Sequence, residues 1–436
     1  MTLRAWDSTR WKPLFFTIWG GQVFSLLGSR LVQFALVWWL TKTTGSGIVL
    51  TTATIAAIVP GVALGPFIGP LIDRFDRRRV MIAADTAIAL VTASLAVLFA
   101  FEMVEIWHIY LIVLARSIGG AFHWPSMQAS TTLMVPEVHY SRIAGLNQSL
   151  QGIAAIVGPP LGALLLELLP IQGVLAIDVL TAAIAVLPLL FIAIPKPQPA
   201  GATRRSFTAD LAEGFRFVLS WPGLMGVVGI AAFLNFLFAP ASALVPLLVT
   251  NHFGGAAFHL AGLQTAMGIG IILGGLLLTV WGGFRRRMAT ALFGVTMLGL
   301  ASLLLGLTPS SLFFLAVAAM FLTGLAQPVA NGSIMAALQA STPPELQGRL
   351  FSLLGSASGV MMPIGLAIAG PLSDIFCANT WFIVGGVAAI SLGALAFLIP
   401  SIVHLEERGA ELTAARVVSP PSSGEDPQPE ADAPAP

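Results

Sequence analysis

The sequence has little charge for its length. Only 9% of its 436 residues are Asp, Glu, Lys or Arg, and 56% are hydrophobic, whereas a typical globular chain has about 25% charged residues. A soluble protein needs a charged surface, which this composition cannot supply. The shortage argues against a soluble enzyme, and a net charge of +1 argues against a nucleic-acid partner.

Cysteine is almost absent. Cys377 is the single cysteine, which excludes an internal disulfide and a multi-cysteine metal site. The sequence also lacks the Gly-x-x-x-x-Gly-Lys-Ser/Thr loop of ATPases and the His-Glu-x-x-His motif of zinc enzymes. We therefore expect no catalytic residues, no bound metal or cofactor and no ATPase activity within this chain.

Long hydrophobic runs take up most of the sequence. A helix needs about 20 apolar residues to cross a bilayer. Such runs lie near residues 14–41, 48–72, 80–100, 106–131, 145–169, 171–194, 223–250, 258–283, 288–307, 310–338, 350–372 and 377–402. They predict an all-α polytopic protein with twelve transmembrane helices. The first run is too long for a signal peptide and lacks a cleavage pattern, so we expect it to be retained.

The basic residues predict the orientation in the cell membrane. With the N-terminus in the cytoplasm, 18 of the 21 Lys and Arg residues lie on cytoplasmic segments, as the positive-inside rule requires. Lys42 lies outside, and Arg30 and Arg116 lie within spans. We therefore expect both termini in the cytoplasm.

The two halves of the sequence resemble each other. A shift of 207 residues places RIAGLNQSLQG (142–152) on RLFSLLGSASG (349–359). Parallel six-helix repeats place a substrate site between the halves, near the middle of the membrane. The predicted parts are an N-terminal six-helix half (1–194), a cytoplasmic linker with an amphipathic helix (195–222), a C-terminal half (223–402) and a mostly disordered cytoplasmic tail (403–436).

The segment after the second span carries a charged motif. It reads Gly69-Pro-Leu-Ile-Asp73-Arg74-Phe-Asp76-Arg77-Arg78-Arg79 and closely resembles the signature loop of the major facilitator superfamily, G-x-L-x-D-R-x-G-R-R/K. Asp76 stands where the family usually has a second Gly. We expect Asp73 to dock against the start of the eleventh span, and the arginines to pair across the two halves. The alternative is a basic loop that only sets the topology. The gating-loop candidates are Gly69, Asp73, Arg74, Arg77 and Arg78.

The fifth span contains Gly158-Pro159-Pro-Leu-Gly162, which resembles the antiporter motif g-x-x-x-G-P-x-x-G-G of the same superfamily. Proline bends a helix, and small residues allow tight packing. We assign Gly158, Pro159 and Gly162 to this motif. A generic kinked packing helix is the alternative.

Several ionisable residues lie inside predicted spans. Arg116 lies near the membrane middle, where a charge costs at least about 2.5–3.5 kcal/mol and should face a cavity or a partner. It resembles the fourth-span arginine of proton-coupled facilitators. The predicted depths of Arg30 and Asp178 in the membrane allow them to form an ion pair. We expect Asp85 to join the charged network of the arginine loop. We name Arg116, Asp178, Arg30 and His123 as proton-coupling candidates. A fixed Arg30–Asp178 pair and a structural His123 are the alternatives.

Polar and aromatic residues recur in the spans and could line a cavity, although many would instead bond between helices. The substrate-cavity candidates are Gln22, Ser25, Gln33, Trp124, Gln128, Asn147, Gln151, Asn235, Gln327 and Asn331.

A finer resemblance covers residues 14–402. Segments such as IWGGQVFSLLGS, RSIGGAFHWP and GLNQSLQGI are similar to the macrolide-efflux branch of the drug:proton antiporters. This implies proton-driven export of macrolides or other small amphiphilic drugs by alternating access, with the proton as coupling ion. We expect the protein to act as a monomer. The alternatives are a siderophore or metabolite exporter of the same fold, and a non-transporting sensor or accessory subunit of a separate ATPase.

Overall fold

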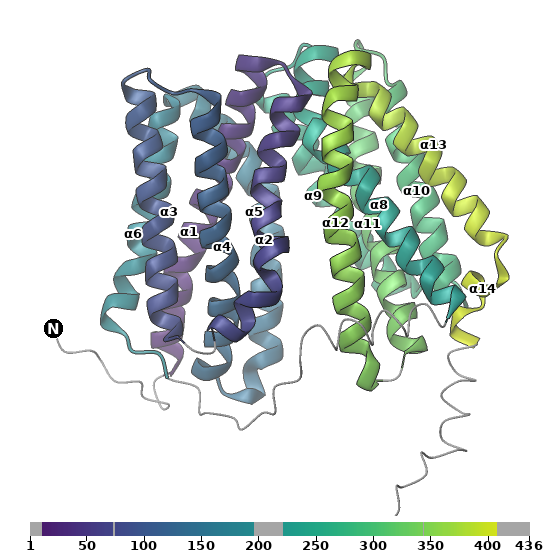
Figure 1. The fold of residues 1–436 in the computed structure, drawn as a ribbon, viewed down its shortest axis with the longest axis horizontal. Helices are drawn as coiled ribbons and strands as arrows, with labels where there is room; N and C mark the ends of the chain where they lie inside the picture. The colour runs from purple at the N-terminus through teal and green to yellow at the C-terminus, as the bar shows by residue number, and fades with distance from the viewer. Residues whose placement is uncertain (1–10, 73–74, 196–220, 343, 408–436) are drawn as a thin grey trace, which may run out of the picture.

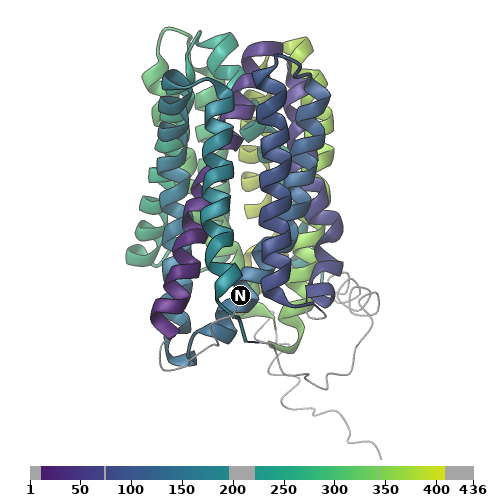
Figure 2. The same cartoon turned by 90° about the vertical axis from the view of Figure 1, so that its left-hand side faces the viewer.

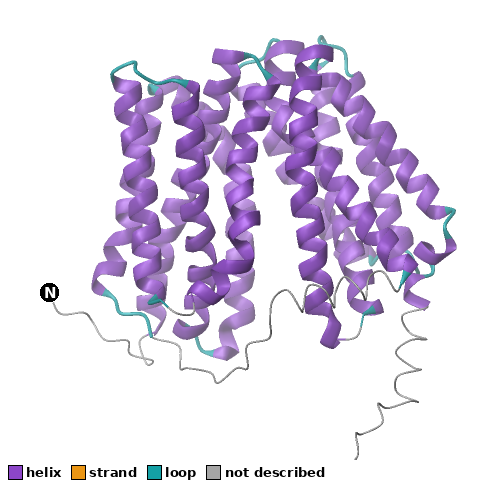
Figure 3. Ribbon diagram, viewed as in Figure 1, coloured by secondary structure: helices purple, strands orange, loops and turns teal. Residues whose placement is uncertain are grey.

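The computed structural model describes residues 11–72, 75–195, 221–342 and 344–407. The regular elements in these ranges are helices (Figure 3). The long helices are α1 (Trp11–Thr44), α2 (Gly47–Ile72), α3 (Arg77–Ala100), α4 (Ile106–Met134), α5 (Tyr140–Leu168), α6 (Ile171–Phe191), α8 (Pro222–Leu247), α9 (Ala257–Trp281), α10 (Arg287–Leu307), α11 (Phe313–Ser341), α12 (Pro344–Phe376) and α13 (Ala378–Phe397). The short elements are η2 (Glu137–His139), η3 (Leu248–His252) and α14 (Pro400–Val403).

These helices confirm the predicted all-α membrane fold. Within the described residues, eleven helical segments are long and apolar enough to cross a membrane. The remaining long helix, α4, has 29 residues and is not one of these eleven segments. Its sequence includes Arg116 and His123, whose polarity lowers its mean hydropathy.

The two halves of the chain pack in the same way. In the first half α1 and α3 contact α6, and α4 contacts α2 and α3; in the second half α8 and α10 contact α13, and α11 contacts α9 and α10. Figure 1 shows the result as two groups of roughly parallel helices, and Figure 2 shows the same helices with the first half facing the viewer. The internal repeat seen in the sequence is therefore also a repeat of helix contacts.

The halves meet through α2 with α12 and α5 with α9. The ribbons of the two halves lie side by side near the turn between α1 and α2. They spread apart toward the end of the bundle that holds α14 (Figure 1). The helices at the interface therefore approach each other more closely at one end of the bundle.

The predicted linker helix lies almost entirely outside the described residues, as does the tail from residue 408. The first tail residues are packed: Leu405 is fully buried, the backbone N–H of Arg287 donates to Glu406 at 3.0 Å, and Arg286 pairs with Glu407 at 3.2 Å. The sequence boundary at residue 403 thus falls inside a segment that contacts α10.

Two adjacent glycines on α9 offer a test of the packing in the second half. A Cβ on Gly274 would lie 2.9 Å from the Cα of Leu325 on α11, whereas a Cβ on Gly275 would meet nothing within 4 Å. We expect Gly274→Ala to destabilise the protein by about 1–3 kcal/mol through overpacking, and Gly275→Ala to be neutral or slightly stabilising. Thermal unfolding of the purified variants in detergent measures the difference. Equal melting temperatures would contradict the close α9–α11 contact.

Candidate functional site

An ion pair joins two helices inside the first half. Nη1 of Arg116 on α4 lies 2.5 Å from Oδ2 of Asp178 on α6, and the two side chains are 13% and 1% exposed. Ser29 on α1 and Thr92 on α3 each donate a hydroxyl hydrogen bond to Asp178 at 3.3 Å. Arg116 also donates to the hydroxyls of Thr92 and Ser29. The buried carboxylate therefore has partners from three helices, as a buried charge requires.

The alternative of a fixed Arg30–Asp178 pair is wrong. Arg30 donates to Gln33 at 3.5 Å and to Gln151 on α5 at 3.4 Å. Successive residues on a helix are rotated by about 100°, so Ser29 faces Asp178 while Arg30 turns toward α5. Arg116 on α4, rather than Arg30 on α1, is the arginine that pairs with Asp178.

A second polar cluster contains His123, Asp85 and Gln22. Nε2 of His123 on α4 lies 2.8 Å from Oε1 of Gln22 on α1 and 3.3 Å from Oδ1 of Asp85 on α3. Nε2 of Gln22 donates to Oδ2 of Asp85 at 3.1 Å. Each of the three side chains thus lies within reach of the other two.

The expectation that Asp85 joins the arginine loop is therefore wrong. Asp85 lies six residues beyond Arg79 on α3, about 9 Å deeper along the helix axis, and is only 4% exposed. At that depth its neighbours are side chains of α1 and α4.

Two glycines allow these contacts to form. A Cβ on Gly28 of α1 would lie 3.0 Å from Oδ1 of Asp178, and a Cβ on Gly119 of α4 would lie 2.7 Å from Ile88 on α3. A Cβ at either position would require a neighbouring side chain or helix to shift. The close approach lets short polar side chains reach across the helix interfaces.

The gating loop is described only in part, because Asp73 and Arg74 lie outside the described residues and Gly69 is placed only as part of α2. Docking of Asp73 against the eleventh span stays a prediction. Asp76, the departure from the family motif, caps α3: its carboxylate accepts from the backbone N–H of Arg78 at 3.1 Å and of Arg79 at 3.4 Å.

Two arginines of the loop bind backbone carbonyls of the first half. Arg77 donates to the carbonyl of Ala129 on α4 at 2.7 Å. Arg78 donates to Leu190 on α6 at 3.0 Å and also to Leu189. These bonds tie the start of α3 to α4 and α6. The expected pairing across the two halves is thus not formed by Arg78 in this conformation.

The antiporter motif packs α5 against α1. A Cβ on Gly158 would lie 3.3 Å from Cβ of Arg30, and one on Gly162 would lie 2.8 Å from the ring of Phe34. Pro159 lies between them inside the helix. The motif therefore positions α5 beside Arg30, close to Gln151.

The cavity candidates divide into several groups. Gln22 belongs to the His123 cluster, Gln33 and Gln151 contact Arg30, and Asn147 accepts a hydrogen bond from Trp19 at 2.8 Å. Asn235 donates to the carbonyl of Ala231 on its own helix. The remaining candidates are at least partly exposed: Ser25, Trp124, Gln128, Gln327 and Asn331.

The sequence reasoning missed a polar junction between the two halves. Asp374 near the end of α12 accepts hydrogen bonds from the hydroxyl of Ser46 at 2.7 Å and from the backbone N–H groups of Gly47 and Ile48, the latter at 3.2 Å. Its carboxylate thus caps the N-terminus of α2, where N–H groups lack partners within the helix. The available signal was an acidic residue at the end of the eleventh span, opposite the start of the second.

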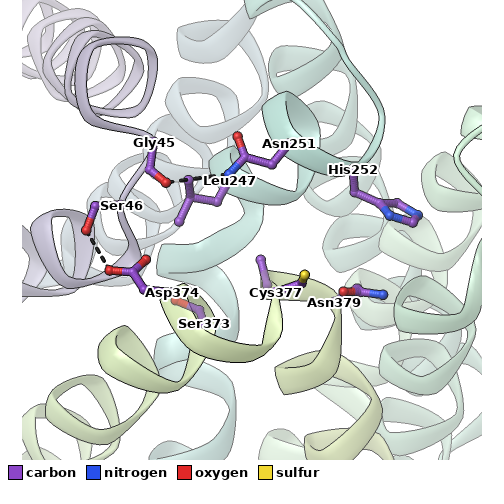
Figure 4. Close-up of a pocket in the computed structure, with 10 residues that line it drawn as sticks. Gly45, Ser46, Leu247, Asn251, His252, Ser373, Asp374, Cys377 and Asn379 are labelled. Atoms are coloured by element: carbon purple, nitrogen blue, oxygen red, sulfur yellow. Dashed lines mark hydrogen bonds between the residues drawn. The ribbon is translucent and has the colours of Figure 1, made fainter.

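A cavity of about 490 Å³ lies at this junction (Figure 4). Asn251, which also lines it, donates to the carbonyl of Gly45 at 3.5 Å. The lining residues are Gly45, Ser46, Leu247, Asn251, His252, Ser373, Asp374, Cys377, Ala378 and Asn379.

Close contacts between the halves continue from the junction toward the middle of the bundle. A Cβ on Gly370 of α12 would lie 3.1 Å from Cα of Ile48, and one on Gly268 of α9 would lie 2.8 Å from Ile156 on α5. The hydroxyl of Thr265 on α9 also donates to the carbonyl of Ile156 on α5, at 3.3 Å. The halves are therefore joined at the end that contains the α1–α2 turn.

Comparison of the sequence with known proteins identifies its family. Residues 7–422 match the family described as transmembrane secretion effector. The chain is 34% identical over 397 residues to macrolide efflux protein A of Streptococcus pyogenes, covering 91% of this chain and 98% of that protein. It is 35% identical over 323 residues to macrolide efflux protein A of Enterococcus faecalis, covering 74% and 100%. It is 26% identical over 393 residues to the multidrug efflux pump Tap of Mycolicibacterium fortuitum, covering 87% and 94%.

Solved structures show the same fold. A bacterial homologue of the human lysosomal transporter Spinster, in an inward-facing and unoccupied conformation, superposes with a TM-score of 0.66 at 13% identity, covering 93% of this chain and 98% of that chain. The nucleoside transporter NupG superposes with a TM-score of 0.68 at 14% identity, covering 87% and 98%. The chain is therefore a multi-pass membrane transporter that belongs to the transmembrane secretion effector family of the major facilitator superfamily.

Proposed function

We propose that this protein exports macrolide-like or other amphiphilic drugs across the cell membrane, driven by inward proton flow. The observation that carries the substrate class is the 34% identity to macrolide efflux protein A over 91% of the chain. The buried ionisable groups of the first half support proton coupling, since such groups inside a membrane mark ion and substrate pathways. The protein acts as a monomer, without a separate ATPase.

The arrangement of the halves supports transport by alternating access. With both termini in the cytoplasm, the junction at Asp374 lies on the outside and closes that side. Opening there separates the start of α2 from the end of α12. The proposed contact of Asp73 with the start of α12 would then hold the cytoplasmic side together. The two carboxylates would stabilise opposite states by the same means, each at the N-terminus of a helix in the other half.

The substrate would bind between the halves, and exposed polar and aromatic side chains of the first half would line the site. Trp124 on α4 is 44% exposed, and Gln128 lies one helical turn away. Ring surfaces bind the apolar body of an amphiphile, while a few polar groups orient it. Such a surface would accept several related drugs.

Accumulation of labelled erythromycin in an efflux-deficient bacterium tests this proposal. We expect cells that make the protein to accumulate several-fold less macrolide, and a protonophore to abolish the difference. Asp73→Asn should lose export, and Glu167→Gln, a change at an exposed carboxylate of α5, should retain it at matched expression.

Unchanged accumulation with correctly inserted protein would overturn the macrolide assignment. Siderophores and other metabolites would then be the next substrates to test. Export that vanadate blocks and a protonophore does not would overturn the proton-driven mechanism in favour of an ATPase partner.

A further inference from the structure

The first half contains two buried ionisable clusters, and they differ in their chemistry. One joins Arg116 to Asp178, and the other joins His123 to Asp85 and Gln22. We propose that the His123–Asp85–Gln22 cluster is the proton-binding site of the transporter, and that the Arg116–Asp178 pair is a permanent tie between helices. The inference rests on the proposed proton-driven export.

The Arg116–Asp178 pair is poorly suited to exchange a proton. A guanidinium group does not lose its proton in proteins, so the proton would have to bind Asp178. That carboxylate is 1% exposed and already accepts hydrogen bonds from Arg116, Ser29 and Thr92. Protonation would leave the Arg116 charge buried without a counterion, which is strongly unfavourable.

The second cluster is suited to the task. Imidazole is the side chain that changes its charge between pH 5 and 8. The side chain of His123 is 18% exposed and lies beside the buried carboxylate of Asp85. The Nε2 atom has its contacts with Gln22 and Asp85, which leaves Nδ1 to take up the added proton. The cluster then passes from a charge of −1 to neutral, and release of the proton from Nδ1 reverses the change.

Gln22 completes the geometry. Its amide accepts from Nε2 of His123 and donates to Oδ2 of Asp85, which fixes the tautomer with a hydrogen on Nε2. The same hydrogen bonds connect α1 to α3 and α4. A proton at this site therefore alters the charge at a point where three helices of the first half meet.

The other charged groups on these helices lie at least six residues away from the members of the cluster. On α4, Arg116 is seven residues from His123, about 10 Å along the axis. On α3, Arg79 is six residues from Asp85, and on α1, Arg30 is eight residues from Gln22. Helix α2 has no charged residue between Gly47 and Ile72. On α6, which packs against α1 and α3, Asp178 is paired with Arg116. On α5, which packs against α1, Arg142 and Glu167 lie near the two ends of the helix. Asp85 is thus the charged partner that His123 contacts.

Proton release on macrolide binding tests the assignment. Purified protein in weakly buffered detergent solution is mixed with saturating erythromycin, and a pH indicator measures the protons released. We expect about one proton per bound macrolide from the wild type, because the cluster contains a single imidazole. His123→Gln should release none while still binding macrolide. His108→Gln removes another histidine of α4, which caps its own helix, and should behave like the wild type.

Asp85→Asn provides a second variant that keeps the shape of the side chain. The imidazolium loses its counterion in this variant, so the pH dependence of macrolide binding should move to more acidic pH. Normal proton release by folded His123→Gln, or an unchanged pH profile in Asp85→Asn, would overturn the assignment. Failure of the wild type to release protons, together with export insensitive to a protonophore, would instead overturn proton coupling itself.

Discussion

Replacing Asp178 by Asn is expected to reduce the amount of folded transporter and the macrolide export by the same factor. The change leaves the guanidinium of Arg116 buried without a counterion, and removal of one partner of a buried ion pair costs about 3–5 kcal/mol. Size-exclusion chromatography of a fluorescent fusion measures the folded protein, and labelled erythromycin measures export. Export per folded molecule should remain sensitive to a protonophore.

The double variant Arg116→Gln/Asp178→Asn separates a structural pair from a proton carrier. Removing both charges avoids the unpaired guanidinium, so the double variant should recover much of the folded protein that the single variant loses. Its export per folded molecule should approach that of the wild type. A well-folded double variant that exports macrolide without regard to the protonophore would show that the proton binds at this pair.

Replacing Asp374 by Ala is expected to open the junction between α2 and α12 and to lower export several-fold. The variant loses the bonds from Ser46, Gly47 and Ile48, and a hydrogen bond to a charged group contributes about 1.5–3 kcal/mol. Each 1.4 kcal/mol changes an equilibrium about tenfold. The ratio of the closed to the open junction should therefore fall at least about tenfold.

Labelling of a cysteine at position 51 measures this opening. Thr51 is 2% exposed and lies against Gly370 in the closed junction. The measurement uses Thr51→Cys in a Cys377→Ser background, because the native cysteine is exposed. A membrane-impermeant maleimide should label the Asp374→Ala variant several-fold faster than its parent.

Glu167→Gln is the matched control for this experiment. Glu167 is exposed at the end of α5 on the same side of the bundle, and its loss should leave the labelling rate unchanged. Equal rates in the parent and in Asp374→Ala would show that Asp374 does not hold the junction closed.

Many residues of the candidate site could be predicted from the sequence, by their residue type and by their expected depth in the membrane. Arg116, Asp178 and His123 stand out because charge and imidazole are rare in apolar spans, and Gly158 and Gly162 stand out as a motif. Their partners could not be predicted in the same way. Arg30 and Arg116 lie at similar depths, yet the rotation of α1 directs Ser29 toward Asp178 and Arg30 toward Gln151.

The sequence by itself determined the helices, the two-fold repeat of the chain and the membrane environment, because these depend on local hydropathy and on the spacing of apolar runs. Only the tertiary structure decided which polar groups meet. The Asp85–His123 contact and the capping of α2 by Asp374 join residues 38 and 326 or more positions apart in the chain. Such contacts depend on how each helix is rotated about its axis and on which neighbour it packs against, and neither is encoded in the hydropathy of a single span.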